Sequence, residues 1–508
     1  MEDHSLLLAG FATACAVFVY TRALKSPSPA PLPPGPKGLP LIGNVLDLPQ
    51  TQAWLTFAKW AEEYGPITHV RVPGLPIIVL NDATCTSDLL DKKGRQYSDR
   101  PRLVMGGELV GWDQGPALAQ FGKPWSDYRR IMAQFLGSRS KIDGSYGRVL
   151  EEATHQYLKD LLSSPAEWVE HGRRFAAAIV LQIAFGYKAE SKDDPLISIV
   201  DEAVAQFSET TAPNAYAVDT FPFLRYVPEW FPGAGWKKKA THYRKTLEAM
   251  LNLPFDMVKM RMAEGTSTTC VVSDLLSGDK KLTPEEEENI KWAAAGIYSG
   301  GAETTAASLE AFILAMTLHP DAQRKAQQEL DAVLGRGVVP TLSDRARLPY
   351  NEALISEAFR LYTIGPLGLP HVATEDDVYD GYFIPKGSII IANNWLFNRD
   401  SGTYANPEVF RPERFISTED HTKERDSRET LFGYGRRTCP GIHLADASTW
   451  LVFTSTLAFF DIKPPVAEDG KPVWPSGKFM DGSISHPEPF QCVITPREGV
   501  IDVIRRLG

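Results

Sequence analysis

The ten residues Phe432-Gly433-Tyr434-Gly435-Arg436-Arg437-Thr438-Cys439-Pro440-Gly441 surround one cysteine with glycine, arginine and proline. A buried thiolate is costly unless nearby groups stabilise its charge. Gly435 and Gly441 allow backbone N–H groups to approach the sulfur of Cys439, and the two adjacent arginines favour its ionised form. The flat side chain of Phe432 suits a flat cofactor. The segment therefore predicts a metal-ligating cysteine; the alternative is a buried structural cysteine beside a basic turn.

The same segment carries a family signature. Phe432, Gly435, Arg437, Cys439 and Gly441 match every fixed position of F-x-x-G-x-R-x-C-x-G, so the chain resembles the cytochrome P450 family. The resemblance implies a haem b cofactor (iron protoporphyrin IX), with Cys439 as the axial thiolate ligand of the iron and the other four residues around the haem. A thiolate ligand donates electron density to the iron and favours O–O cleavage.

A long helix is expected upstream of this segment, between Thr283 and His319. Thr283 and Glu286 predict a capping box at its start, with Pro284 at the first helical position. The adjacent glycines at positions 300–301 weaken its centre by about 1 kcal/mol each relative to alanine. We therefore expect another group to lie against the helix backbone at these glycines.

Glu303 and Thr304 follow the two glycines directly. A carboxylate and a hydroxyl at such a point can order water and deliver protons. Segment 300–305 also fits the family motif [AG]-G-x-[DE]-T-[TS], which implies that Glu303 relays protons and that Thr304 holds the reacting oxygen. The alternative is a threonine bonded to its own helix beside a surface glutamate.

Three further residues resemble ligands of the haem propionates. Trp125 and Arg129 fit a W-x-x-x-R element, and their i, i+4 spacing places both on one helix face. His371 lies where relatives place another propionate ligand, although it could equally be a solvated loop histidine. The remaining histidines, including His443, are interpreted as packing or surface residues.

A structural network is expected from residues 357, 360 and 414. Glu357 and Arg360 share one helical face, and Arg414 lies in a segment that resembles the family element P-E-R-F. The resemblance implies that these three side chains form a buried triad that fixes the loop of Cys439. Asn398 replaces a histidine common in the family, which puts one supporting hydrogen bond in doubt.

Composition indicates a large folded domain and argues against several other classes of protein. The chain has 508 residues, of which 43% are hydrophobic, with a net charge of −10. It can therefore form a large core, and the absence of a long basic run argues against nucleic-acid binding. Five scattered cysteines without a C-x-x-C pair indicate neither a disulfide framework nor a zinc site. No G-x-G-x-x-G fingerprint opens a strand–helix unit, so the NADPH electrons that the resemblance implies would come through a separate reductase.

Residues 1–25 are predicted to form an N-terminal transmembrane anchor. The apolar run 6–20 is followed by Arg22 and Lys25, which places the following domain in the cytosol. About eighteen helical residues span about 27 Å, the thickness of the endoplasmic reticulum bilayer. A cleavable signal is the alternative, but the start of the chain is acidic rather than basic.

Residues 26–45 are rich in proline and predict a stiff hinge. Residues 46–508 are expected to form one large catalytic domain, mainly α-helical with small β-sheets near both ends, as in the cytochrome P450 fold. Two hairpins are predicted, one joining strands within 67–80 and one joining 378–384 to 388–392.

The resemblance implies a monooxygenase that inserts one atom of O₂ into a medium-sized, largely apolar substrate: a terpenoid, steroid, stilbenoid or polycyclic aromatic. NADPH-cytochrome P450 reductase would supply electrons. Segment 97–101 and the ending around His486-Pro487 resemble the basidiomycete branch of the family, which implies a membrane-bound enzyme of fungal secondary metabolism or xenobiotic oxidation. The substrate is expected to contact segments 105–118, 297–301, 363–369 and 482–484. Arg425, Arg428 and Arg436 would supply positive charge for docking of the reductase.

Two other functions fit a haem-thiolate protein. The first is an isomerase or dehydratase that acts on a preformed peroxide without a reductase. The second is a haem sensor or carrier. The presence of both Glu303 and Thr304 favours the monooxygenase, because enzymes of the first kind often lack this pair.

Overall fold

The computed structural model describes residues 28–507 except 73–74, 190–193, 213–214 and 279–280. The predicted anchor, residues 1–25, lies outside the described residues. Within the part that is described, no helix has the length and apolar character needed to cross a membrane.

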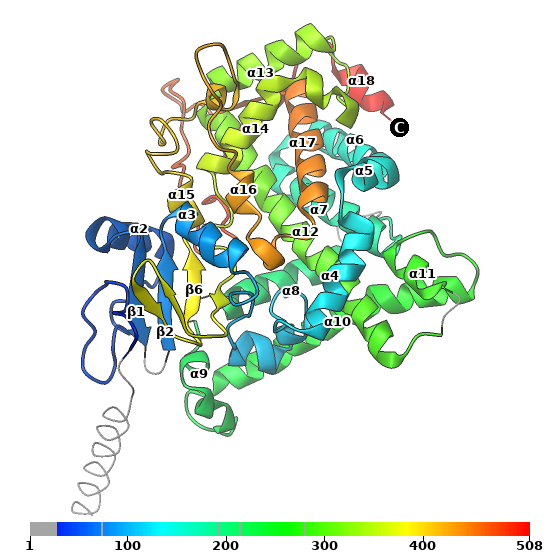
Figure 1. Cartoon of the computed structure of the whole chain (residues 1–508). Coiled ribbons are helices and arrows are strands. Elements are labelled where there is room, and N and C mark those ends of the chain that lie inside the picture. The colour runs from blue at the N-terminus through cyan, green and yellow to red at the C-terminus, as the bar shows by residue number, and fades with distance from the viewer. Residues whose placement is uncertain (1–27, 73–74, 190–193, 213–214, 279–280, 508) are drawn as a thin grey trace, which may run out of the picture.

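Most of the described chain is helical (Figure 1). The helices are α2 (Ala53–Tyr64), α3 (Ala83–Thr86), α4 (Lys123–Leu136), α5 (Arg139–Lys141), α6 (Gly147–Ser163), α7 (Trp168–Phe185), α8 (Pro195–Thr211), α9 (Ala217–Thr220), α10 (Gly235–Ala263), α11 (Val271–Leu276), α12 (Pro284–Leu318), α13 (Pro320–Val333), α14 (Pro349–Leu361), α15 (Asn394–Phe397), α16 (Arg428–Leu431), α17 (Ile442–Phe459) and α18 (Ile501–Arg506). Short irregular helices include η1 (Ser87–Lys92), η2 (Val104–Val110), η6 (Pro222–Tyr226), η7 (Leu342–Arg347), η8 (Pro412–Phe415) and η9 (Gly435–Arg437).

Helix α12 runs through the helical body and packs against α4, α7, α8 and α17. The predicted capping box is present: Thr283 Oγ1 accepts from the N–H of Glu286 at 3.2 Å, and the Glu286 carboxylate accepts from the N–H of Thr283 at 2.9 Å. Its second half is buried almost all round, as expected of a helix that is apolar on every face. The helix ends at His319, because Pro320 begins α13.

Three small sheets lie around this body. The largest has the strand order β1-β2-β6-β3, with β1 (Ile67–Val72) antiparallel to β2 (Leu75–Leu80), as predicted. Strand β6 (Ile389–Ala392) runs parallel to β2 and antiparallel to β3 (His371–Val372). The other two pair β4 (Asp377–Tyr379) with β5 (Tyr382–Ile384), and β7 (Phe460–Lys463) with β8 (Val493–Pro496).

The second predicted hairpin is wrong. Asp380 and Gly381 both have positive φ, 49° and 77°, and two such residues in succession make a tight hairpin turn. The chain therefore folds back within 378–384, between β4 and β5. Strand β6, which was expected to pair with that segment, joins the larger sheet instead.

The described part of the proline-rich segment runs along the sheets. The carbonyl of Pro31 accepts from the N–H of Phe383 at 2.7 Å, and the carbonyl of Pro34 accepts from the N–H of His69 at 2.9 Å. A Cβ atom on Gly35 would collide with the carbonyl oxygen of His69. Glycine is therefore needed where this segment crosses β1.

Candidate active site

Cys439 lies in a tight loop that leads directly into α17. Its N–H donates to the carbonyl of Phe432 at 2.7 Å, and the N–H of Gly441 bonds to the sulfur. Gly435 has a positive φ, and a Cβ atom there would collide with the carbonyl oxygen of Leu90. Its own N–H donates to a different partner, a carboxylate oxygen of Asp91, at 2.5 Å. Of the two glycines expected to aim N–H groups at the sulfur, only Gly441 does so.

Burial raises the pKa of the Cys439 thiol, while the Gly441 N–H and the Arg129 guanidinium act in the opposite direction. Arg436 is exposed, with its guanidinium over the ring of Phe121. The expectation that the arginines beside the cysteine favour the thiolate therefore needs correction, because Arg129 on α4 has that role. Within the protein the thiol is hard to ionise, which fits a sulfur that becomes a thiolate when it binds a metal.

A cavity of about 420 Å³ lies between this loop and α12. Phe432, Cys439 and Gly441 line one side, and Gly300 and Thr304 line another. Its size and largely apolar walls are typical of a small-molecule site.

Three buried or half-buried arginines line this cavity at one edge. Arg100 donates to the carbonyls of residues 369 and 370 at 2.7 and 2.8 Å. Arg437 donates to the carbonyls of residues 98 and 119 at 2.7 Å each, and Arg129 donates to the carbonyl of residue 438 at 2.6 Å. Within the described ranges, no carboxylate lies within ion-pair distance of any of the three, although Asp99 acts electrostatically on Arg100 and Arg437. Burial lowers the pKa of Arg100 to about 9 and that of Arg437 to about 10.

Buried cations without anionic partners are costly, so this cluster indicates an anionic ligand. The two propionate carboxylates of a haem would supply that charge, and Cys439 would bind the iron. The residues present therefore fit the cofactor. The sequence does not predict a role for Arg100, because nothing in its local sequence indicates that its guanidinium faces the cavity.

Trp125 and His371 lie in the same cluster. The Trp125 ring is buried, with the Arg437 guanidinium carbon 4.8 Å from its centroid. His371 is buried on β3, and its Nδ1 bonds to the carbonyl of Tyr97 at 2.6 Å. Burial lowers the pKa of His371 to about 3, with Arg100 contributing. The alternative of a solvated loop histidine is therefore wrong, and a bound carboxylate would counter the repulsion from the arginines.

The two central glycines of α12 have different roles. A Cβ atom on Gly300 would meet open space, whereas one on Gly301 would lie 2.5 Å from Val180 Cγ1 on α7. Gly300 therefore leaves room in the cavity, and Gly301 permits close packing of two helices, so within the described residues the expected neighbour lies against the backbone only at Gly301. The helix itself continues through both residues.

Thr304 lines the cavity, and its hydroxyl donates to the carbonyl of Gly300 at 2.7 Å. The hydroxyl oxygen remains able to accept a hydrogen bond. Glu303 is not among the residues that line the cavity: its carboxylate lies 2.7 Å from Nε2 of His486. Glu303 is thus held by another side chain and is not a surface glutamate. His486 is buried between two carboxylates, so its interpretation as an ordinary packing or surface residue is wrong.

The predicted triad is present between α14 and η8. The Arg360 and Arg414 guanidinium groups bond to the Glu357 carboxylate at 2.7 and 3.1 Å, and all three side chains have 0% exposure. Arg414 also pairs with Glu424 at 2.6 Å, a partner that the sequence did not suggest. Asn398 donates its side-chain amide to Thr363, while its Oδ1 has no hydrogen-bond partner among the described residues.

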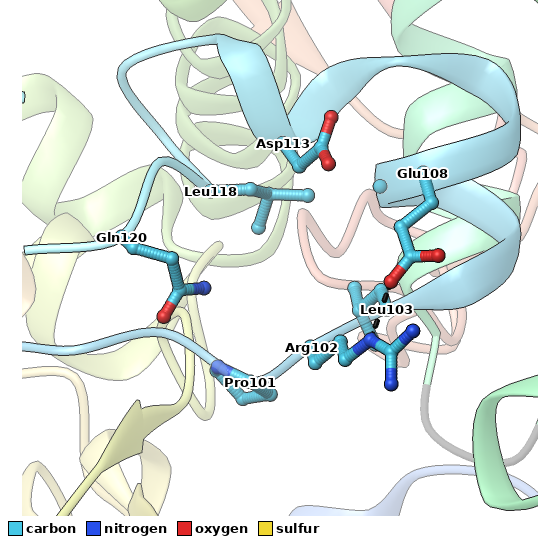
Figure 2. Close-up of a pocket in the computed structure, with 8 residues that line it drawn as sticks. Pro101, Arg102, Leu103, Glu108, Asp113, Leu118 and Gln120 are labelled. Carbon is cyan, nitrogen blue, oxygen red and sulfur yellow. Dashed lines mark hydrogen bonds and ion pairs between the residues drawn. The ribbon is translucent and has the colours of Figure 1, made fainter. Parts of the chain in front are cut away.

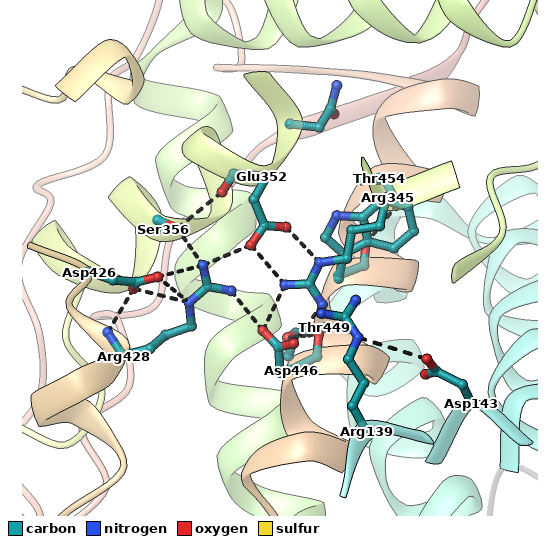
Figure 3. A network of polar contacts seen from close by, with 12 residues as sticks. Arg139, Asp143, Arg345, Glu352, Ser356, Asp426, Arg428, Asp446, Thr449 and Thr454 are labelled. Atoms are coloured by element: carbon teal, nitrogen blue, oxygen red, sulfur yellow. Dashed lines mark hydrogen bonds and ion pairs between the residues drawn. The ribbon is translucent and has the colours of Figure 1, made fainter. Parts of the chain in front are cut away.

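A second ionic network ties α16 to α14 and α17 (Figure 3). Arg428 bonds to Glu352, Asp426 and Asp446 at 2.7–2.8 Å, and Arg345 of η7 bonds to two of the same carboxylates. Arg428 is therefore not free for reductase docking, contrary to expectation. Arg425 likewise pairs with Glu429 at 2.9 Å.

A smaller pocket of about 320 Å³ opens beside η2 (Figure 2). Its polar lining includes Arg102, Glu108, Asp113 and Gln120, and Arg102 is ion-paired with Glu108. The pocket does not include Cys439 or any of the three arginines of the main cavity. The chemistry is therefore assigned to the larger cavity.

Comparison with known proteins agrees with this geometry. The Cytochrome P450 family model matches residues 33–493. The chain is 44% identical over 488 residues to cytochrome P450 monooxygenase 208 of Postia placenta, covering 96% of this chain and 94% of the relative. It is 41% identical to cytochrome P450 monooxygenase claR of Ampulloclitocybe clavipes (94% and 88% covered) and 37% identical to tryptamine 4-monooxygenase of Psilocybe cyanescens (97% of each). The chain therefore belongs to the cytochrome P450 family of haem-thiolate monooxygenases.

Proposed function

We propose that this enzyme oxidises a medium-sized, neutral and largely apolar organic substrate with electrons that a separate reductase delivers from NADPH. The balanced reaction is RH + O₂ + NADPH + H⁺ → ROH + NADP⁺ + H₂O. Haem bound at Cys439 would supply the activation of O₂. The observation that supports this proposal is the cavity of about 420 Å³ with apolar walls beside Cys439.

The walls of the cavity favour an apolar substrate. Trp112, Val180, Phe207, Ile364 and Ile484 supply its large apolar surfaces. All four segments expected to contact substrate contribute to the lining, and α7 and α8 add residues that the sequence did not indicate. Hydroxyl groups of Ser299 and Ser483 could orient a polar end of the substrate.

The charge of the cavity lining favours a neutral substrate over an amine like the one named for a relative. No aspartate or glutamate occurs among the described residues that line the cavity, whereas a buried ammonium group would need such a partner. We therefore expect a terpenoid, steroid, stilbenoid or polycyclic aromatic rather than an amine such as the tryptamine of the Psilocybe relative.

The experiment that tests this function uses purified enzyme reconstituted with NADPH-cytochrome P450 reductase. Neutral apolar compounds should displace the water ligand of the ferric iron and shift its absorption, and some should be converted to monooxygenated products. Tryptamine serves as the charged comparison and should do neither. Conversion of an organic hydroperoxide without NADPH, in the absence of NADPH-dependent product, would instead support the isomerase or dehydratase.

Thr304→Ala should uncouple the reaction. Within the proposed function, Thr304 holds the proton-accepting oxygen and Glu303 supplies protons, so the variant should bind substrate and consume NADPH but release hydrogen peroxide. We expect the fraction of NADPH recovered as product to fall by about 10²-fold.

Thr317→Ala is a matched control for this prediction. Thr317 lies on the same helix and donates to the carbonyl of Ile313 at 2.8 Å, as Thr304 does to that of Gly300, but it is fully buried and does not line the cavity. Its variant should remain coupled. Equal coupling in Thr304→Ala and the wild type would remove Thr304 from proton delivery.

We further propose that the enzyme sits on the endoplasmic reticulum membrane with its catalytic domain in the cytosol and residues 1–25 as its anchor. An aromatic surface around η6 supports contact with lipid: Phe223, Tyr226 and Trp230 are 67%, 79% and 81% exposed. Large exposed aromatic groups of this kind are typical of membrane interfaces.

A chain beginning at Ser28 provides the test of this surface. It should still bind to phospholipid vesicles, and Phe223→Ser combined with Trp230→Ser should weaken that binding by about tenfold or more. Val409→Ser is the control, because Val409 is also exposed but lies outside this aromatic surface. Equal binding of all three proteins would argue against a membrane role for the aromatic surface.

A further inference from the structure

A buried histidine bridges two carboxylates of α12 immediately behind the cavity wall. Glu303 and Glu310 lie seven residues apart and so share one face of the helix. His486, from the C-terminal segment, places Nε2 at 2.7 Å from the Glu303 carboxylate and Nδ1 at 3.0 Å from the Glu310 carboxylate. Both ring nitrogens therefore face acceptors, which only the doubly protonated imidazolium can satisfy by donating twice.

The surroundings keep this histidine charged. Burial alone lowers the pKa of His486, but the hydrogen bonds to Glu303 and Glu310 outweigh that effect and raise it to about 9. One oxygen of Glu310, Oε1, is buried without a hydrogen-bond partner in the part of the chain described. This oxygen can therefore accept a further hydrogen bond.

Other titratable groups face this cluster from neighbouring helices. Burial raises the pKa of Asp201 on α8 to about 6, with Glu303 contributing and Arg173 of α7 opposing. Glu170 of α7 contributes in the same direction as Glu303. The groups that face His486 directly are the two glutamates of α12.

The cluster is connected to the cavity on both sides. Thr304, the residue after Glu303, lines the cavity, as do Ser483 and Ile484, three and two residues before His486. The N–H of Ser485 donates to the carbonyl of Ile364, another cavity residue, at 2.8 Å. The segment that carries His486 is therefore fixed to the cavity wall.

We propose that His486 is a positioning residue for proton delivery: bonded to both Glu303 and Glu310, its imidazolium holds the Glu303 carboxylate in place beside Thr304. The inference rests on the proposed monooxygenase function and adds a third group to its proton supply. His486 touches neither substrate nor haem in this role. It acts through the orientation of Glu303.

The first test measures the charge of His486 directly. The diamagnetic ferrous carbon monoxide complex, labelled at histidine, is titrated by NMR, and the His486 signal is identified by its absence in His486→Gln. The ring should keep its second proton up to about pH 9. Loss of that proton near pH 6.5, the ordinary pKa of histidine, would show that the two glutamates do not hold His486 in its charged form. This titration does not depend on turnover, so it stands even if the proposed function fails.

The second test measures coupling. His486→Gln should leave the carbon monoxide spectrum and substrate binding intact but lower the fraction of NADPH recovered as product by about tenfold. His319→Gln is the control, because His319 is a half-buried histidine whose Nε2 bonds to the hydroxyl of Tyr362 rather than to a carboxylate. Equal coupling in His486→Gln and the wild type would overturn the proposal, provided that the wild type forms product.

The pH dependence of coupling distinguishes a positioning role of His486 from a role in packing alone. Wild-type coupling should be constant between pH 6 and 8 and fall as His486 loses its proton through about 9. Glu310→Gln removes one of the two carboxylates that raise this pKa, so the fall should move to lower pH. If coupling falls at the same pH in Glu310→Gln and the wild type, Glu310 does not hold His486 in its charged form and the proposal is contradicted. The Glu310→Gln variant also keeps the test available if His486→Gln does not fold.

Discussion

Replacing Glu357 with alanine should lower the free energy of unfolding by roughly 3–5 kcal/mol. The carboxylate of Glu357 is the shared partner of Arg360 and Arg414, and all three side chains have 0% exposure. It also accepts from the N–H of Arg411 at 2.6 Å. Removing it leaves two buried guanidinium groups without this partner, a large loss for a protein whose total stability is expected to be about 5–15 kcal/mol.

The loss should appear both in denaturant unfolding and in haem content. Glu152→Ala is the matched control: Glu152 forms an i, i+4 pair with Arg148 at 2.8 Å, but the two side chains are 45% and 89% exposed. An exposed pair of this kind contributes only about 0–1 kcal/mol. If Glu357→Ala is no less stable than Glu152→Ala, the triad does not hold the Cys439 loop.

Residues in local motifs were predictable from sequence. The signature around Cys439, the W-x-x-x-R element and the position of His371 predicted groups that meet at one cavity, and Cys439, Arg129 and His371 all line it. Local spacing was also sufficient for the capping box of α12, because the two residues that form it are three positions apart.

Contacts between distant segments were not predictable in the same way. His486 reaches Glu303 across 183 positions, and Arg100 shares the cavity with Arg437 although the two residues come from distant segments of the sequence. The second hairpin was predicted wrongly for the same reason, because the sequence pattern at 388–392 indicates a strand but not which strand it pairs with. The sequence likewise did not show that three carboxylates, two of them distant along the chain, neutralise the charge of Arg428.

Cys439→Ala should abolish monooxygenation altogether. Cys439 presents the sulfur at the cavity, with the N–H of Gly441 bonded to it. Alanine cannot bind iron, so the axial thiolate and the electron density that it donates would be lost. The fold itself should survive, because removing one sulfur from a wall of the cavity leaves the Glu357 network untouched.

The most direct measurement is the absorption difference spectrum of the ferrous protein with and without carbon monoxide. The wild type should give the strongly red-shifted band of a haem-thiolate complex. Cys492→Ala, which removes a half-buried cysteine that does not line the cavity, should keep that band, and Cys439→Ala should lose it. A Cys439→Ala protein that retains the red-shifted band would contradict the assignment of Cys439 as the ligand of the haem iron.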